Sequence, residues 1–372
     1  MLSLLLHIIL HVKMSMPMNS KRKLLTVMMS VASAVVAMAS SSCSGSSESA
    51  PEQTTPVQTE YPIAINTMHH NDPFFFADEE SQMYYHVHPR YNLNGTPAAL
   101  DLFESPNLTN WRQAGVAWEP SRTFLGNNDC WAPDIYKYKG KHYIFVTFSR
   151  IRDISEISHW NLENFEIKAG TTVFVSDKGP KGPYRELLPA DKLNVTPSDW
   201  MCIDGSLYVD DEGNPWMIYS GELTQFYDGR VYAQRMSDDL SSLIGEPTLL
   251  FTASEAPWVR NSGVHDGKLV YITDAPYAWK DPASGNLIMI FSSNSDSGYA
   301  MGQAISKSGS ILGPWEQQPE RLNTDTGGHG HVFKDLDGNL RISYHTRNFG
   351  TGAYVSTVKP ISIVDGKFQK IN

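Results

Sequence analysis

The chain has 372 residues, of which 41% are hydrophobic and 19% charged. This composition is that of an ordinary globular protein and excludes a fibrous or wholly disordered one. Forty carboxylates against 30 basic side chains give a formal net charge of −10. A charge of that sign repels phosphate backbones, so nucleic acid is not expected as a partner.

The first 43 residues have the order of a secretory signal peptide. A basic cluster at 21–23 precedes an apolar run over 24–39, and small residues follow up to Cys43. That order is typical of a cleaved export signal. The run is shorter than the roughly 20 apolar residues that a transmembrane helix needs, so we expect removal rather than a membrane span. Met18 is an alternative start, because residues 1–17 lie upstream of the basic cluster.

Cys43 directly follows a run of small residues, which resembles a bacterial lipoprotein cleavage site. The resemblance implies that Cys43 becomes the lipidated first residue of an exported protein. This lipid would hold the protein to the outer membrane or the periplasmic face, and we expect no other contact with a membrane. The alternative is cleavage after Ala39, which would give a periplasmic or secreted protein. In either case residues 44–60, rich in Ser, Glu, Gln, Thr and Pro, are expected to form a flexible tether.

Two further cysteines, Cys130 and Cys202, lie in the remaining chain. An oxidising compartment would allow them to form a disulfide. One bridge is not a disulfide framework, and free buried thiols are an equal alternative, so their pairing stays open.

A repeated strand pattern follows the tether. A strand, a polar turn and a second, strongly apolar strand recur without any long helical pattern. The unit occurs five times, over 74–86, 135–148, 207–219, 277–291 and 332–344. A further strand and turn follow each unit, so each repeat supplies about four antiparallel strands, the size of a propeller blade. We therefore predict an all-β fold, a five-bladed β-propeller that occupies residues 61–372 as one domain.

A polar signature stands before the first strand of each repeat. The five signatures are HNDP at 70–73, WAPD at 131–134, IDGS at 203–206, TDAP at 273–276 and GHGH at 328–331. Because the innermost strands of a propeller start at one end of its central channel, we expect these side chains to converge there. Carboxylates around one cavity shift one another's pKa, so one can act as a base while another keeps its proton. Cleavage of an acetal requires that division.

Taken in order, these signatures resemble glycoside hydrolase family 43 over essentially the whole chain after residue 60. The family implies a five-bladed propeller, an inverting mechanism, and mainly arabinofuranosidase, xylosidase or arabinanase activity. The implied substrates are terminal or side-chain α-L-arabinofuranosyl or β-xylosyl linkages of plant-type polysaccharides and oligosaccharides. By position, Asp72 would be the general base that activates water, and Asp204 would tune the acid's pKa and orient the sugar.

Further side chains would surround the sugar. The resemblance implies that Trp131 and Asp134 line the pocket, with the tryptophan as an apolar platform. Trp200 and Trp258 are candidate walls, and packing between blades is the alternative for both. His329 matches a family histidine that helps to hold a central calcium or its waters, although the chemistry needs no cofactor. A lone histidine cannot bind calcium, which prefers several oxygen ligands.

The general acid is where the sequence departs from the family, which usually has Glu-Gly-Pro where this chain has Asp274. Glu255 keeps a Glu-x-Pro pattern but precedes the fourth hairpin by about twenty residues. Glu222 ends the second strand of the third repeat, which returns to the end where Asp204 lies. Asp274 occupies the family position with a shorter side chain, and would otherwise line the substrate pocket. These three carboxylates remain open candidates.

Three other functions remain in competition. The missing glutamate favours a carbohydrate-binding propeller that has lost catalysis. A galactosidase-type member of the same family is the second alternative. The third is a related glycosidase acting on fructosyl or anhydrogalactosyl sugars.

Overall fold

The computed structural model describes residues 60–151, 167–198, 200–222, 225–265, 267–347 and 352–371. The predicted signal peptide and the tether up to residue 59 lie outside these residues. Two 3₁₀ segments, η1 (Ile65–Thr67) and η3 (Ala253–Glu255), stand among the strands. Within the described ranges, no helix is long and apolar enough to cross a membrane.

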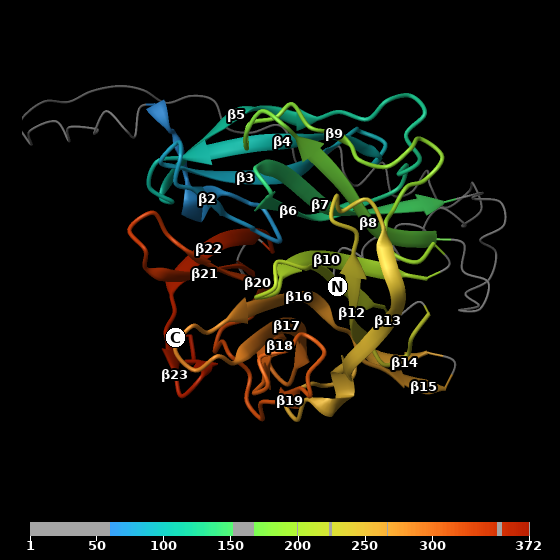
Figure 1. Ribbon diagram of the computed structural model, residues 1–372, viewed down its shortest axis with the longest axis vertical. Helices are drawn as coiled ribbons and strands as arrows, with labels where there is room; N and C mark the ends of the chain where they lie inside the picture. Colours follow the sequence, from blue (N-terminus) through green and yellow to red (C-terminus); the bar gives the residue numbers. More distant parts are fainter. Residues whose placement is uncertain are drawn as a thin grey trace, which may run out of the picture. The chain divides into compact units, whose positions relative to one another are not determined.

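Five antiparallel sheets form the blades (Figure 1). The first blade contains β2 (Phe76–Asp78), β3 (Met83–Tyr91), β4 (Pro97–Ser105) and β5 (Asn110–Trp118), with β1 (Ile63–Ala64) paired to β5. The second contains β6 (Cys130–Tyr138), β7 (Lys141–Ile151), β8 (Ile167–Ser176) and β9 (Arg185–Glu186). The third contains β10 (Cys202–Val209), β11 (Pro215–Gly221), β12 (Arg230–Met236) and β13 (Leu243–Thr252).

The remaining two blades complete the ring. The fourth contains β16 (Asp274–Lys280), β17 (Leu287–Ser295), β18 (Gly298–Ser306) and β19 (Glu316–Gln317). The fifth contains β20 (Gly327–Lys334), β21 (Leu340–Arg347) and β22 (Tyr354–Pro360). Two small hairpins lie outside the blades, β14 (Gly263–His265) with β15 (Lys268–Val270), and β23 (Ile363–Val364) with β24 (Lys367–Phe368). The predicted five-bladed propeller is confirmed, and all five predicted hairpins are present.

Aspartate-based turns close several of these hairpins. In the third blade, Oδ1 of Asp210 accepts the backbone N–H groups of Glu212 and Asn214 at 3.1 and 2.7 Å. In the fifth blade, Oδ1 of Asp335 accepts the equivalent amides of residues 337 and 339 at 3.1 and 2.7 Å. Such side-chain bonds to the following backbone are why aspartate favours turns. The polar turns in the sequence therefore fix the register of the two innermost strands.

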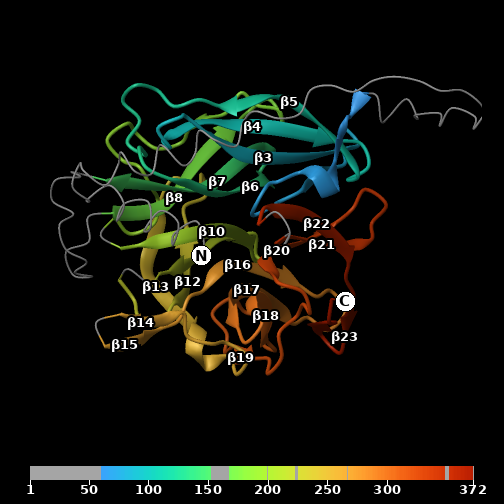
Figure 2. The same cartoon turned by 180° about the vertical axis from the view of Figure 1, so that it is seen from behind.

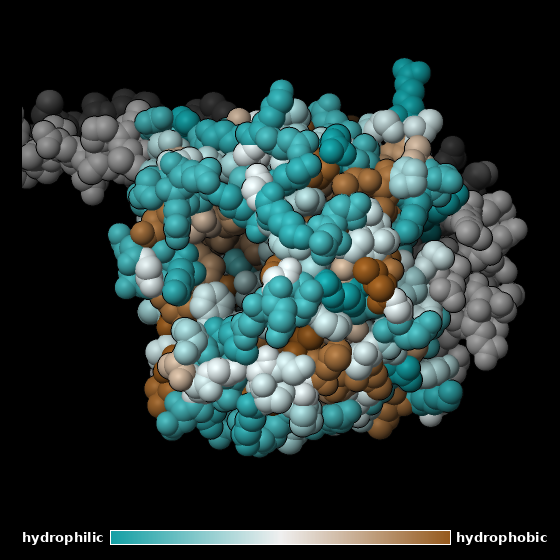
Figure 3. Space-filling view, viewed as in Figure 1, coloured by the Kyte–Doolittle hydropathy of each residue, from teal (hydrophilic) through white to brown (hydrophobic). Residues whose placement is uncertain are grey.

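Apolar side chains fill the interfaces between blades. The five buried clusters each contain residues of two neighbouring blades, for example Val87 with Ile144, Val173 with Met217, Ile218 with Met289, Ile290 with Val332, and Phe75 with Phe333. Burial of each large apolar side chain stabilises the fold by about 1.5–3 kcal/mol. Polar residues cover much of the face seen in Figure 3, with apolar patches between them.

The ring closes between the fifth blade and the first. The hydroxyl of Ser343 donates to the carbonyl of Pro73 at 2.6 Å, and the amide of Leu336 donates to the Tyr84 hydroxyl at 2.8 Å. Figures 1 and 2 both show β21 and β22 beside the first blade. Segments about 270 residues apart are thus joined, so the innermost strands surround one channel.

The two cysteines of the propeller do not form a disulfide. Cys130 begins β6 and Cys202 begins β10, and both are buried and outside any disulfide. Their apolar surroundings are the two different clusters that flank the second blade. Of the two alternatives, Cys130 and Cys202 are therefore buried thiols without a disulfide.

Candidate active site

The innermost segment of each blade contains one residue with a left-handed backbone. The φ angles are 52° at Asp72, 48° at Ala132, 54° at Asp204, 50° at Ala275 and 60° at His329. In the second to fifth blades, pairing with the next strand shifts register across this residue. A bulge of this kind bends a strand and redirects its side chains. Since non-glycine residues with this conformation cluster at functional sites, the five positions mark the end of the channel where chemistry is expected.

Neighbouring blades hold the bulges in place. The amide of Asp72 donates to Nδ1 of His345 at 3.1 Å. The amide of Asp204 donates to Oγ1 of Thr147 at 2.8 Å, and that of His329 donates to Oγ of Ser292 at 2.8 Å. Each acceptor lies on the second strand of the preceding blade. The interfaces between blades therefore set the positions of the functional side chains.

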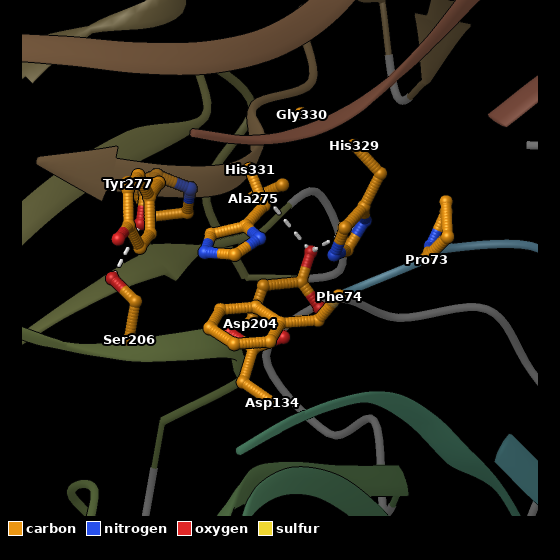
Figure 4. Close-up of a pocket in the computed structure, with 11 residues that line it drawn as sticks. Pro73, Phe74, Asp134, Asp204, Ser206, Ala275, Tyr277, His329, Gly330 and His331 are labelled. Carbon is orange, nitrogen blue, oxygen red and sulfur yellow. Dashed lines mark hydrogen bonds and ion pairs between the residues drawn. The ribbon is translucent and has the colours of Figure 1, made fainter. Parts of the chain in front are cut away.

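Three of the bulge residues form a charged cluster. Nδ1 of His329 lies 3.2 Å from Oδ1 of Asp72 and 3.9 Å from Oδ2 of Asp204, so these two carboxylate oxygens are at most about 7 Å apart. Figure 4 shows the side chains of Asp204 and His329 pointing towards each other. The side chains of Asp72, Asp204 and His329 are 13%, 7% and 13% exposed. The predicted convergence of residues distant in sequence is confirmed for these three.

A small cavity continues inward from this cluster. Its empty space is about 290 Å³ with open solvent included, and its lining includes the second residue after each bulge: Phe74, Asp134, Ser206, Tyr277 and His331 (Figure 4). Asp134 accepts a hydrogen bond from the Tyr136 hydroxyl at 2.9 Å. As expected for a pocket residue, Asp134 lines this cavity together with Asp204 and His329.

Asp72 is the carboxylate most strongly held in its ionised form. Burial alone raises its pKa, but the charge of His329, the contact with His345 and a hydrogen bond from Asn71 outweigh burial. The net result is a pKa well below the usual range. The side-chain amide of Asn71 donates from Nδ2 to Oδ2 of Asp72 at 2.6 Å. Asp72 therefore carries a negative charge throughout the pH range in which an enzyme works.

The surrounding carboxylic acids behave in the opposite way. Burial, with repulsion from Asp274 and Asp72, raises the pKa of Asp204 to about 7. Burial, with repulsion from Asp204 and Asp72, raises the pKa of Asp134 to about 8. Burial also raises the pKa of Asp274. The site therefore holds one ionised carboxylate beside acids that keep protons near neutral pH, the division that acetal cleavage requires.

The pKa of the histidine in the cluster is raised. Burial lowers the pKa of His329, but the carboxylates of Asp72, Asp204, Asp134 and Asp274 raise it further than burial lowers it. A protonated imidazole between two carboxylates reduces their mutual repulsion. His329 thus allows acidic side chains from several blades to share one small space.

Residues 61–363 match the sequence model of the glycosyl hydrolases family 43. The chain belongs to this family. A solved endo-arabinase from Bacteroides thetaiotaomicron is similar, with 42% sequence identity, a TM-score of 0.71, and coverage of 82% of this chain and 99% of that one. The α-L-arabinofuranosidase of Lactobacillus brevis shares the fold at 17% identity, with a TM-score of 0.63 and coverage of 81% and 93%. The β-D-galactofuranosidase xynD of Aspergillus niger is 22% identical over 301 residues, 74% of this chain and 75% of that protein.

The predictions of the family, of its propeller and of an inverting glycosidase are therefore confirmed. By the resemblance of its sequence signatures, the general acid is expected at the start of the fourth blade. Asp274 stands at that position, directly before Ala275. Its Oδ2 accepts the Tyr299 hydroxyl at 2.9 Å. Trp131 has the equivalent place in the second blade and is half-buried.

Glu222 follows the second strand of the third blade and bonds to the backbone of the fourth blade next to Asp274. It follows β11 directly and is 3% exposed. Its Oε1 accepts the amide of Thr273 at 2.7 Å, while Oδ2 of Asp204 accepts the amide of Ala275 at 3.0 Å. Two carboxylates thus hold the peptide groups on either side of Asp274. The expected return of the second strand to the channel end is what brings Glu222 there.

Glu255 is not brought to this cluster. It is exposed, and its Oε1 accepts the amide and hydroxyl of Thr252 at 3.0 and 3.3 Å. This arrangement caps η3, which follows the outermost strand of the third blade. The Glu-x-Pro pattern at 255–257 is explained by a helix N-terminus, where such capping boxes are common. Glu255 therefore lacks the position that a general acid requires.

The remaining tryptophans have different surroundings. Trp258 is buried between the third and fourth blades, 5.5 Å from the ring of Phe291, and a Cβ on Gly302 would lie 2.3 Å from its indole. It packs blades together, as in the alternative interpretation. Trp200 is half-buried, with Tyr232 at 5.1 Å on one side. A wall of the sugar pocket remains a prediction for Trp200.

A calcium site does not form from the side chains of the channel. In the described part of the chain, no group of three or more His, Cys, Asp or Glu residues is arranged to hold a metal. Nδ1 of His329 lies 3.2 Å from Oδ1 of Asp72. A central ion held through waters stays a prediction.

Sequence reasoning missed Asn71, His345 and Tyr299 as partners of the carboxylates. His345 ends the second strand of the fifth repeat, so the argument that found Glu222 applies to it equally. Asn71 directly precedes Asp72 in the sequence, but neighbouring positions alone do not predict that the two side chains form a hydrogen bond. Tyr299 lies near the start of the third strand, β18, and no motif in the sequence marks it.

Proposed function

We propose that this family 43 enzyme hydrolyses α-L-arabinofuranosyl linkages of arabinan-type polysaccharides or oligosaccharides, with inversion at the anomeric carbon. The observation that carries the proposal is the contrast between ionised Asp72 and the proton-holding acids around it. The choice of arabinose is supported by 42% identity to a structure named as an endo-arabinase. β-Xylosyl linkages are the competing pentosyl substrate, and terminal or side-chain residues are the proposed points of cleavage.

Asp72 is the proposed general base. Its carboxylate is ionised and half-buried, and Asn71, His345 and His329 fix its orientation. One oxygen would take a proton from a water that attacks the anomeric carbon. Positioned general bases accelerate such steps by about 10²–10⁴-fold.

Asp274 is the proposed general acid, with Asp204 as the residue that raises its pKa. Asp274 is half-buried, whereas Glu222 is almost completely buried and already accepts the Thr273 amide. Asp204 is held next to Asp274 by its bond to the Ala275 amide. Glu222 then acts by fixing the backbone that carries Asp274.

Hydrolysis assays test the substrate and the mechanism together. Purified protein should release reducing sugar from linear arabinan and cleave nitrophenyl α-L-arabinofuranoside faster than nitrophenyl β-D-xyloside or β-D-galactofuranoside. NMR of the first product should show the anomer opposite to that of the substrate. Retention would contradict the mechanism, and preference for the xyloside or the galactofuranoside would contradict the sugar assignment. Binding of arabinan without hydrolysis would favour the alternative of a non-catalytic propeller, which the absence of a glutamate at position 274 supports.

We also propose that the enzyme is exported and lipidated at Cys43. The basic, apolar and small-residue order of residues 21–43 supports this. In a bacterial host, the full chain should incorporate a labelled fatty acid and fractionate with membranes. A Cys43→Ser variant should lose both properties, whereas unchanged fractionation would contradict lipidation at this residue.

A further inference from the structure

Tyr299 contacts the proposed acid through its hydroxyl. It is the second residue of β18 and is half-buried. Its O–H donates to Oδ2 of Asp274 at 2.9 Å. Burial and the nearby carboxylates of Asp274, Asp72 and Asp204 raise the pKa of Tyr299, so the phenol stays protonated and remains a donor.

The ring of Tyr299 is stacked on His345. The two centroids are 5.7 Å apart and the ring planes differ by 8°. Nδ1 of His345 lies 3.1 Å from Oδ1 of Asp72, and Tyr354 packs edge-on against the same imidazole at 4.7 Å. A stack of two rings therefore connects Asp274, at the start of the fourth blade, with Asp72, at the start of the first.

Gly328 leaves room for this stack. A Cβ at this position would lie 2.2 Å from Cε1 of Tyr299, closer than any real contact. The φ angle of Gly328 is not in the left-handed region, so the backbone does not demand glycine there. The Gly-His-Gly signature of the fifth blade thus has a steric function beside His329.

We propose that Tyr299 is the positioning residue of the general acid, and that its stack with His345 fixes Asp274 relative to Asp72. The proposal rests on the proposed function, because it assigns a partner to that acid. A purely structural role would require only the ring, since packing against His345 and Gly328 does not involve the hydroxyl. The hydroxyl instead orients one carboxyl oxygen of Asp274 and leaves the other for the glycosidic oxygen.

The hydrogen bond also affects the acid after proton transfer. Once Asp274 has given its proton to the leaving oxygen, the carboxylate accepts the Tyr299 O–H in a charge-assisted bond. The bond lowers the pKa of Asp274 against the larger effect of burial, which raises it. Loss of the hydroxyl should therefore raise the pKa of Asp274 and weaken it as an acid.

Tyr299→Phe tests the proposal in the full enzyme. It keeps the ring and removes the hydroxyl, so the fold should be retained. We expect kcat on arabino-oligosaccharides to fall about tenfold, with less than about a threefold change for a dinitrophenyl arabinoside, whose leaving group needs little acid assistance. The alkaline limb of the kcat profile should move to higher pH. Gly328→Ala, which displaces the ring, should reproduce the loss on oligosaccharides.

Tyr344→Phe is the matched control. Tyr344 is fully buried in the fifth blade and donates its hydroxyl to Oδ2 of Asp325 at 2.8 Å, away from the channel carboxylates. It should keep the wild-type pH profile and the wild-type ratio of the two substrates. The proposal is overturned if Tyr299→Phe does the same while the wild-type enzyme hydrolyses arabinan. Failure of the proposed function would differ, because wild-type protein would then show no such hydrolysis.

Discussion

Aspartates at the two ends of the blades lie in opposite environments. At the hairpin end, Asp335 accepts the amides of residues 337 and 339 and pairs with Arg341 at 2.8 Å. Although burial raises its pKa, these donors lower it to a net value below normal. At the channel end, burial and neighbouring carboxylates raise the pKa of Asp134 to about 8 and of Asp204 to about 7.

The difference lies in what surrounds the carboxylate. Turn aspartates face backbone N–H groups, which favour the charged form, so their ionisation stabilises the fold. Channel aspartates face one another, so their ionisation opposes folding while it prepares acid and base for catalysis. Asp72 is the exception at the channel end, because His329 lies beside it and the side chain of Asn71 donates to it, and both lower its pKa.

The largest expected effect on catalysis is at Asp72. Asp72→Asn removes the only channel carboxylate with a strongly lowered pKa among those described, and with it the proposed base. We expect kcat on arabinan to fall by about a thousandfold, within the range for loss of a general base. Circular dichroism and thermal unfolding should show that the fold is retained. Activity within tenfold of wild type would contradict the assignment.

A second comparison separates the two carboxylates at the start of the fourth blade. Asp274→Asn should lower kcat about 100-fold on oligosaccharides and much less on a dinitrophenyl arabinoside, as expected for loss of an acid. Glu222→Gln keeps an oxygen for the Thr273 amide, so we expect less than about a tenfold loss on both substrates. The reverse pattern, with leaving-group rescue in Glu222→Gln alone, would transfer the role of acid to Glu222.

The sequence predicted the fold and most of the channel residues. Repeated hairpins indicated blades, and the start of each first strand indicated one end of the channel, which brought Asp72, Asp204 and His329 together correctly. It did not predict the bulge, because the left-handed conformation at Ala132 and Ala275 leaves no mark in residue type.

Which side chains meet between blades was not predicted from the pattern, although the position of His345 near the end of a second strand offered a signal. His345, in the fifth blade, approaches Asp72 because the fifth and first blades are neighbours. Tyr299 donates to Asp274 within the fourth blade and stacks on His345 because the fourth and fifth blades are neighbours. Glu255 illustrates the reverse error. A local pattern that resembled the family acid belongs to the cap of η3, and only the position of that segment outside the channel separates the two interpretations.

The pH dependence of stability should differ in sign between the two ends. The lowered pKa of Asp335 means that its stabilisation is present above its unfolded pKa, near 4, and is lost as pH falls. Asp335→Ala removes a charged acceptor and its bonds to the backbone amides and Arg341. It should therefore destabilise the protein by about 2 kcal/mol at pH 7. The loss should diminish below pH 4. Thermal or denaturant unfolding across pH would measure both changes.

Asp134 provides the opposite case. Since its folded pKa is raised to about 8, its stabilisation is present below pH 4 and is lost as pH rises towards 8. Asp134→Asn removes this dependence, so the variant should gain stability relative to wild type as pH rises from 5 to 8. A difference that stays constant over this range would contradict a buried, proton-holding Asp134.

The smallest effect is expected at Glu255, which lies outside both groups of aspartates. Glu255→Ala removes the bonds to the Thr252 amide and hydroxyl, and loss of such a cap costs about 0.5–1 kcal/mol. Because η3 is exposed at Glu255 and lies beyond the outer strand of the third blade, kcat on arabinan should stay within about twofold of wild type. Glu255→Gln is the matched variant, since its amide oxygen can still accept the Thr252 bonds and should preserve stability. A 100-fold loss of kcat in Glu255→Ala, with recovery on a dinitrophenyl arabinoside, would instead require that the loop after β13 moves into the channel during catalysis.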